Sequence, residues 1–144
     1  MGPTKLRIGA ICSAGASAIQ AAYALLQRKG VQLNVVTHRQ AGIETFCRSN
    51  AIPHVRLEER DKERFSLLAK DWLASQDIDF AILFLDRILS RAFVEAVYTV
   101  NFHPSLLPAF AGTHAVERTL AANAPYLGAT AHRAIEGVDE GPIL

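Results

Sequence analysis

Two side chains suited to carbonyl chemistry lie two residues apart in the stretch N-F-H-P, which begins at Asn101. In an extended strand, residues i and i+2 project from the same face, so Asn101 and His103 would point together. An amide donates hydrogen bonds and an imidazole can carry a proton, and both suit a carbonyl oxygen that becomes negative during nucleophilic attack. Pro104 has no backbone N–H, so we expect the strand to end there with His103 at its mouth. The residue types equally allow two polar side chains that only satisfy their own hydrogen bonds at a strand end.

An acid and a second histidine follow later in the chain. Asp139 lies in the glycine-containing segment V-D-E-G-P, and His132 ends the apolar run before it. A carboxylate beside a histidine orients the ring and supports its charge. The spacing does not establish that Asp139 reaches His103, because most acidic residues in such loops are exposed. The other histidines have no ligand spacing, so we expect no metal site.

The segment S-A-G-A-S-A, residues 13–18, joins an apolar run to a helical pattern. Backbone N–H groups at the start of a helix attract anions, so this turn is a candidate phosphate site. It contains neither G-x-G-x-x-G nor the lysine of a P-loop. A turn of small residues also serves tight packing alone, and both interpretations stay open.

Alternating apolar and amphipathic segments predict how these residues are positioned. Short apolar runs predict strands at 6–12, 31–38, 54–57, 80–85, 99–103 and 126–132. Helical periodicity predicts helices that end near residue 30 and that cover 43–49, 65–75, 88–98 and 113–123. The alternation predicts a single three-layer α/β domain over residues 1–144, with a mostly parallel sheet. Such sheets bind ligands beyond the carboxyl ends of their strands, where we expect Leu85, Asn101, His103 and His132.

Composition excludes several classes of function. The chain has 144 residues, 50% of them hydrophobic, and a formal net charge of +1, which favours neither a nucleic-acid nor an anionic-membrane partner. No apolar run reaches the 18 or so residues of a membrane span, and the N-terminus does not resemble a signal peptide. Cys12 and Cys47 match no metal or redox spacing, so we expect free thiols in a reducing compartment. A cytoplasmic protein is the expectation.

Three segments together resemble a known family. N-F-H-P-S-L-L-P-A-F-A-G-T-H-A, G-A-T-A-H and V-D-E-G-P-I are similar to the formyltransferases that use 10-formyltetrahydrofolate, nearest to the glycinamide ribonucleotide branch and also to the formyltetrahydrofolate deformylases. The resemblance implies a Rossmann-like sheet with helices on both faces and a cis peptide before Pro108. It also implies transfer of a formyl group from 10-formyltetrahydrofolate to a small amine, nominally glycinamide ribonucleotide in purine biosynthesis, without a metal.

The resemblance also assigns residues to roles. The implied catalytic residues are Asn101, His103 and Asp139. The implied folate-binding residues are Arg87, Ile88, Leu89, His132 and Val138. The implied acceptor-binding residues are Gly15, Ala16, Ser17 and Ala18.

The sequence departs from the family pattern at three places. Ala14 and Ala16 stand where the family has glycines in the first turn, and Ala18 stands where it has an asparagine. Asp86 places a charge at a usually apolar position. The sequence stops at Leu144, before further family strands, so we expect C-terminal strands to be missing and a sheet edge to be exposed. That edge would be covered by a partner or by a second copy in a homo-oligomer, or it would stay uncovered. Two other functions therefore stay open: hydrolysis of formyltetrahydrofolate, and folate binding with a decayed acceptor site.

Overall fold

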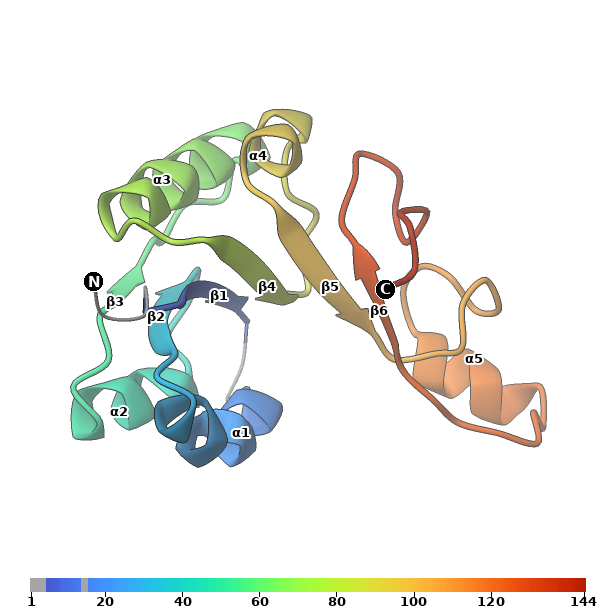
Figure 1. Cartoon of the computed structure of the whole chain (residues 1–144). Coiled ribbons are helices and arrows are strands. Elements are labelled where there is room, and N and C mark those ends of the chain that lie inside the picture. Colours follow the sequence, from blue (N-terminus) through green and yellow to red (C-terminus); the bar gives the residue numbers. More distant parts are fainter. Residues whose placement is uncertain (1–4, 14–15) are drawn as a thin grey trace.

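The computed structural model describes residues 5–13 and 16–144, which form a sheet between two layers of helices (Figure 1). The strands are β1 (Arg7–Cys12), β2 (Gln32–Thr37), β3 (His54–Arg56), β4 (Phe80–Phe84), β5 (Thr99–His103) and β6 (Thr130–Arg133). The helices are α1 (Ser17–Arg28), α2 (Gly42–Ser49), α3 (Lys62–Ser75), α4 (Arg91–Ala96) and α5 (Ala115–Ala121). The strand order is β3-β2-β1-β4-β5-β6, and every pairing is parallel except that of β5 with β6. The predicted three-layer, mostly parallel fold is confirmed.

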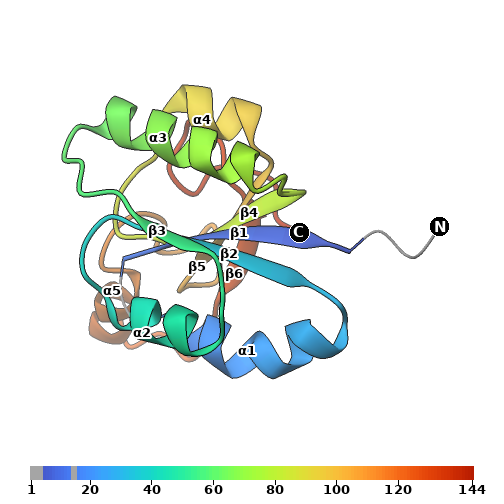
Figure 2. The same ribbon diagram turned by 90° about the vertical axis from the view of Figure 1, so that its left-hand side faces the viewer.

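The two faces of the sheet carry separate cores because side chains alternate along each strand. Helices α1 and α2 cover one face, where Ile19 and Cys47 pack with Ala10 of β1 (Figure 2). Helices α3 and α4 cover the other face, where Phe65 and Phe93 pack with residues of β1 and β4. The strands between these layers read as continuous apolar runs because both of their faces are buried.

Three elements begin at least three residues from where the sequence predicted. Helix α3 begins at Lys62 rather than at residue 65, because the side chain of Asp61 caps it by accepting a hydrogen bond from the Arg64 N–H at 2.8 Å. Helix α4 begins at Arg91 rather than at residue 88, because the side chain of Ser90 caps it by accepting a hydrogen bond from the Phe93 N–H at 3.3 Å. Strand β6 begins at Thr130 rather than at residue 126, and it runs antiparallel to β5. His132 therefore does not lie at the same sheet edge as the carboxyl ends of the parallel strands. It pairs in register with Asn101 instead.

The outer edge of β6 is partly paired by the chain itself. The Arg133 N–H donates to the Pro142 carbonyl at 2.9 Å, and the Leu144 N–H donates to the Ala131 carbonyl at 3.0 Å. Residues 142–144 therefore occupy hydrogen-bonding positions along the edge that we expected to be exposed. A homo-oligomer at this edge stays a prediction.

Both cysteines are buried free thiols. Burial raises the pKa of the Cys12 thiol to about 12, and the nearby Cys47 adds to the shift. Burial also raises the pKa of the Cys47 thiol to about 11, with a further contribution from Glu44. Both side chains therefore pack as neutral groups at physiological pH.

Within the described residues, no group of three His, Cys, Asp or Glu side chains is placed to hold a metal ion. None of the helices in that same part of the chain is long and apolar enough to cross a bilayer.

Candidate active site

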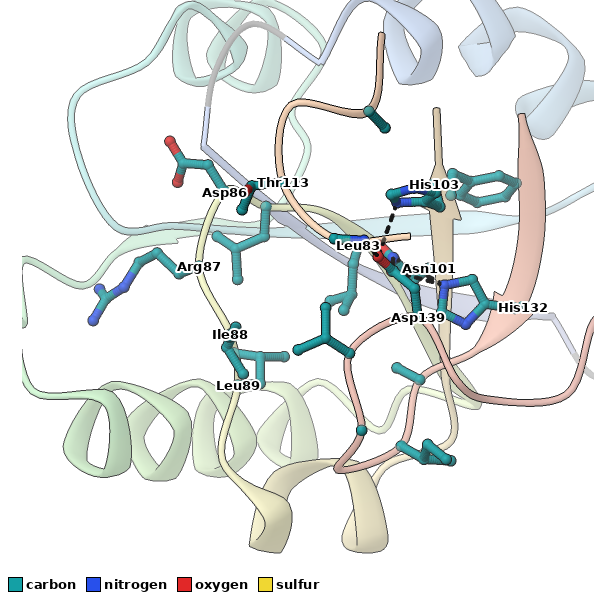
Figure 3. Close-up of a pocket in the computed structure, with 18 of the residues that line it drawn as sticks. Leu83, Asp86, Arg87, Ile88, Leu89, Asn101, His103, Thr113, His132 and Asp139 are labelled. Carbon is teal, nitrogen blue, oxygen red and sulfur yellow. Dashed lines mark hydrogen bonds and ion pairs between the residues drawn. The ribbon is translucent and has the colours of Figure 1, made fainter. Parts of the chain in front are cut away.

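Three segments converge on the candidate site. Strand β5 presents Asn101 and His103, and the antiparallel β6 places His132 beside Asn101. The chain after β6 then loops back and delivers Asp139 to all three side chains (Figure 3). Gly141 makes this return possible, because a Cβ atom there would overlap the carbonyl oxygen of Arg133.

The Asp139 carboxylate is the centre of the site. Its Oδ1 lies 3.2 Å from Asn101 Nδ2 and 3.3 Å from His132 Nε2. Its Oδ2 lies 3.1 Å from His103 Nδ1 and accepts the Gly112 N–H at 2.7 Å. The Asp139 and His103 side chains are each 6% exposed, and that of His132 is 2% exposed. A carboxylate is an acceptor only, and the donors matched to it are Asn101, His103 and the Gly112 N–H.

Each ring nitrogen of His103 and His132 has a polar partner. His103 Nε2 lies 3.0 Å from the Phe110 carbonyl oxygen, while Nδ1 faces Asp139. Both partners are acceptors, so both ring nitrogens carry hydrogen when the two bonds are made, which is the protonated form of His103. His132 Nδ1 faces the Arg133 carbonyl at 3.0 Å, which leaves Nε2 to accept a hydrogen bond from Asn101 Nδ2 at 3.1 Å.

A cavity of about 560 Å³ opens beside these side chains. Its apolar wall includes Leu83, Leu85, Leu89, Val94, Ile135 and Val138. Asn101, His103, His132 and Asp139 line its polar side. The volume lies in the range of small-molecule sites, about 300–1,000 Å³, and an apolar wall with a few convergent polar groups suits a flat aromatic ring.

The segment 86–89 lines the same cavity, and the guanidinium of Arg87 has its partners outside that cavity. Its guanidinium donates to the carbonyls of Glu59 and Arg60 at 2.7 and 2.8 Å and lies 4.6 Å from the Phe65 ring centroid. Figure 3 shows the Arg87 side chain pointing away from Asn101, His103 and Asp139. The charged end of Arg87 therefore holds the segment before α3. Ile88 is exposed and Leu89 is buried at the cavity wall.

A second polar group, the turn cluster of Ser13, His38, Arg39 and Asp86, lies at the carboxyl ends of β1, β2 and β4. Asp86 Oδ1 accepts from the Ser13 hydroxyl at 2.5 Å and lies 3.1 Å from His38 Nε2, while Oδ2 accepts from Arg39 at 2.7 Å. Burial raises the pKa of Asp86, but the Ser13 hydroxyl, Arg39 and His38 together lower it below its usual value. Sequence reasoning singled out Asp86 only as a departure and missed His38 and Arg39, which lie two strands away from it in the sequence.

The described residues implied for acceptor binding, Ala16, Ser17 and Ala18, do not line the cavity. Gly15 lies outside the described residues. Ala16 has a left-handed backbone with φ of 48° and gives no side-chain cap to α1. Ser17 and Ala18 are exposed in the first turn of that helix. None of these three described residues lines the cavity that holds His103. The Leu107–Pro108 peptide is cis, as the resemblance implied.

Comparison with known proteins identifies the family. The formyl transferase family model matches residues 6–144. The chain belongs to this family. The phosphoribosylglycinamide formyltransferase of Mycobacterium tuberculosis is 50% identical over 60 residues, which cover 40% of this chain and 28% of that protein. The formyltetrahydrofolate deformylase of Mycobacterium bovis is 40% identical over 75 residues, which cover 50% of this chain and 24% of that protein. The matched segments thus span less than a third of these curated relatives.

A solved structure of the same family supports the fold over almost the whole chain. The phosphoribosylglycinamide formyltransferase of Bacillus halodurans superimposes with a TM-score of 0.85 at 30% identity, over 95% of this chain and 76% of that one. The predicted Rossmann-like formyltransferase fold is therefore confirmed. The family resemblance stated from the sequence motifs is confirmed as well.

Proposed function

We propose that this chain transfers a formyl group from 10-formyltetrahydrofolate to a small amine. The observation that carries the proposal is the gathering of Asn101, His103 and His132 around the Asp139 carboxylate, beside a cavity of about 560 Å³ with an apolar wall. The apolar wall would hold the pterin ring, with Ile88, Leu89 and Val138 against it. The formyl group would lie at the polar side, and no metal takes part.

The amine nitrogen attacks the formyl carbon, forms a C–N bond and leaves a tetrahedral oxyanion. Asn101 is the hydrogen-bond donor for this oxyanion, and protonated His103 stabilises it by its positive charge, since both of its N–H groups face Phe110 and Asp139. In the structure, the Asn101 amide donates to Asp139 and lies within bonding distance of His132. The oxyanion would replace His132 as the acceptor of one of these amide hydrogens. His132 is therefore the residue that keeps this donor aligned before the formyl oxygen arrives.

The proton and charge must then move to the leaving group. The amine loses one proton, the bond from the formyl carbon to the folate nitrogen breaks, and that nitrogen gains one proton. Asp139 offsets the charge of His103 at 3.1 Å and assists this proton movement as a base. A carboxylate in a site from which water is largely excluded acts more strongly on its partners than one in bulk water.

Glycinamide ribonucleotide is the nominal acceptor, because the mycobacterial and Bacillus relatives carry that specificity in their names. A further relative is named a trifunctional purine biosynthetic protein, which supports a place in purine biosynthesis, and we propose the cytoplasm as the compartment. The residues that would take the acceptor phosphate are Gly15, Ala16, Ser17 and Ala18. The uncapped N–H groups at the start of α1 support this assignment.

Hydrolysis of formyltetrahydrofolate is the second candidate, since a deformylase is among the relatives with 40% identity over 75 residues. In that reaction water takes the place of the amine. A third candidate is folate binding without turnover, which the alanines of the first turn and the charge of Asp86 favour.

One assay separates these functions. The protein is incubated with 10-formyltetrahydrofolate, with and without glycinamide ribonucleotide, and release of tetrahydrofolate is followed. We expect release that depends on the amine. Release without the amine would indicate the hydrolase, and folate binding without release would contradict both enzymatic proposals. Alanine in place of Asn101, His103 or Asp139 should leave the fold intact and abolish transfer, and near-normal turnover in any of them would remove that residue from the mechanism.

A further inference from the structure

The segment Phe110–Thr113 supplies two backbone groups to the candidate site. The Phe110 carbonyl faces His103 Nε2 at 3.0 Å, and the Gly112 N–H donates to Asp139 Oδ2 at 2.7 Å. These contacts come from the loop between β5 and α5, so the hydrogen-bonding state of both ionisable side chains depends on how that loop is held. A shift of about 1 Å in such a group can reduce a rate a hundredfold.

The backbone of this segment adopts a φ value at Phe110 that such residues rarely adopt on their own. Phe110 has φ of 57° and Gly112 has φ of 88°. A bulky residue in the left-handed region is rare, and such conformations persist only where surrounding contacts enforce them. The conformation of this segment therefore depends on contacts from elsewhere in the fold.

Arg118 of α5 makes the enforcing contacts. Its Nη1 donates to the Ala111 carbonyl at 2.8 Å and to the Thr113 carbonyl at 3.3 Å, on either side of Gly112. Its guanidinium carbon lies 5.9 Å from the centroid of the Phe110 ring. A Cβ atom at position 112 would lie 3.8 Å from the same Nη1, so the guanidinium sits directly behind the glycine.

Arg118 bonds to the backbone rather than to an acidic side chain. Among the described residues, Arg118 has no carboxylate within ion-pairing distance, and its donors go to backbone carbonyls instead. One nitrogen, Nη1, makes both of these hydrogen bonds, while the planar guanidinium also lies near the Phe110 ring, a combination that the compact ammonium of a lysine does not reproduce. Exposed arginines usually form weak surface ion pairs or none. This one is used to fix a loop.

We propose that Arg118 is a positioning residue of the candidate site. It holds the Phe110–Thr113 segment so that the Phe110 carbonyl meets His103 and the Gly112 N–H meets Asp139. Arg118 touches no reacting atom in this proposal. Its effect on turnover rests on the proposed formyl transfer, whereas its effect on His103 does not.

The test uses Arg118→Ala, Arg118→Lys and, as the matched control, Arg28→Ala, which removes an exposed helical arginine outside the cavity. Side-chain ¹⁵N NMR spectra of the histidines report the hydrogen bond at His103 Nε2 without any turnover, with the His103 signal assigned from His103→Gln. We expect the His103 signals to move in Arg118→Ala, while those of His38 and His54 stay in place. Unchanged His103 signals would overturn the proposal.

Kinetics give the second readout. We expect Arg118→Ala to lower kcat about ten- to a hundredfold, with KM for the folate within about twofold of wild type. The kcat of Arg118→Lys should lie between those of wild type and Arg118→Ala. Added guanidinium ion should restore part of the kcat lost in Arg118→Ala. A normal kcat, or a loss that appears only together with unfolding in circular dichroism, would contradict the positioning role. If the wild-type protein shows no turnover, formyl transfer fails and the NMR result alone decides the role of Arg118.

Discussion

The candidate site and the turn cluster use similar residues in opposite ways. Both place a carboxylate against a histidine near strand ends on the same side of the sheet. Asp139 is 6% exposed, and Asn101, His103, His132 and a backbone N–H surround it. Asp86 has a side chain that is 51% exposed, and it faces Arg39 and His38. Burial, rather than residue type or the presence of several polar partners, distinguishes these two clusters.

This difference has an energetic consequence. Charged groups in a water-poor site interact strongly, and removing one partner leaves the others unmatched. Exposed ion pairs contribute about 0–1 kcal/mol because solvent and salt screen them. Matched substitutions at the two carboxylates should therefore differ greatly in their effects.

The largest effect is expected from Asp139→Asn. The amide has a donor where the carboxylate has an acceptor, so it cannot satisfy Asn101, His103 and Gly112 together. We expect turnover to fall about 10²- to 10⁴-fold, with a loss of about 1–3 kcal/mol in the free energy of unfolding. Steady-state release of tetrahydrofolate and urea unfolding measure the two quantities. Glu140→Gln, at the exposed neighbouring acid, is the control and should keep both near wild type; turnover within threefold in Asp139→Asn would refute the central role of the carboxylate.

The next effect is expected from Gly141→Ala, which tests the loop that delivers Asp139. The added Cβ would overlap the Arg133 carbonyl oxygen, so the backbone must shift. We expect about 1–3 kcal/mol of destabilisation, and a fall in turnover because Asp139 moves with the loop. Gly30→Ala serves as the control, since Gly30 has φ of 72° but nothing within 4 Å of the added atom. It should destabilise the protein by about 1 kcal/mol without changing turnover. Equal turnover losses in both variants would mean that stability, not placement, limits activity.

The smallest effect is expected from Asp86→Asn. The pKa of Asp86 is lowered from its ordinary value of 3.8, so its ion pairing stabilises the fold above that pH and the contribution is lost as pH falls through the folded-state pKa. At neutral pH we expect a difference in unfolding free energy of about 0.5–1 kcal/mol, small because the side chain is half exposed. The difference between wild type and Asp86→Asn should shrink below pH 4 and at high salt. A difference that grew on acidification would show that the sign of this contribution is wrong.

The sequence predicted the layered α/β arrangement better than it predicted strand β6 at the edge of the sheet. Buried parallel strands such as β4 are apolar throughout, so their position is visible without any alignment. The direction of β6 was not visible, because a strand of four residues has the same pattern in either direction. The true start of α4 depends on a single cap by Ser90, which periodicity over a longer window obscures.

The candidate site could be predicted only in part. Asn101 and His103 share a face of a strand, which local spacing reveals. Their contact with Asp139 depends on a loop that returns 38 residues later in the sequence (139 minus 101). Only the folded structure reveals this contact. The loop contacts of Arg87 and Arg118 involve backbone carbonyls, and no sequence pattern marks which carbonyl is free to accept.

The central claim is that the buried cluster around Asp139 moves a formyl group to an amine. A single-turnover experiment with 10-formyltetrahydrofolate labelled in the formyl group, glycinamide ribonucleotide and excess protein tests it directly, because the position of the label is read after one reaction. The account predicts label in the amide of the acceptor for wild type and unreacted folate for Asp139→Asn. Label found in free formate, or in the acceptor to the same extent with Asp139→Asn, would contradict it.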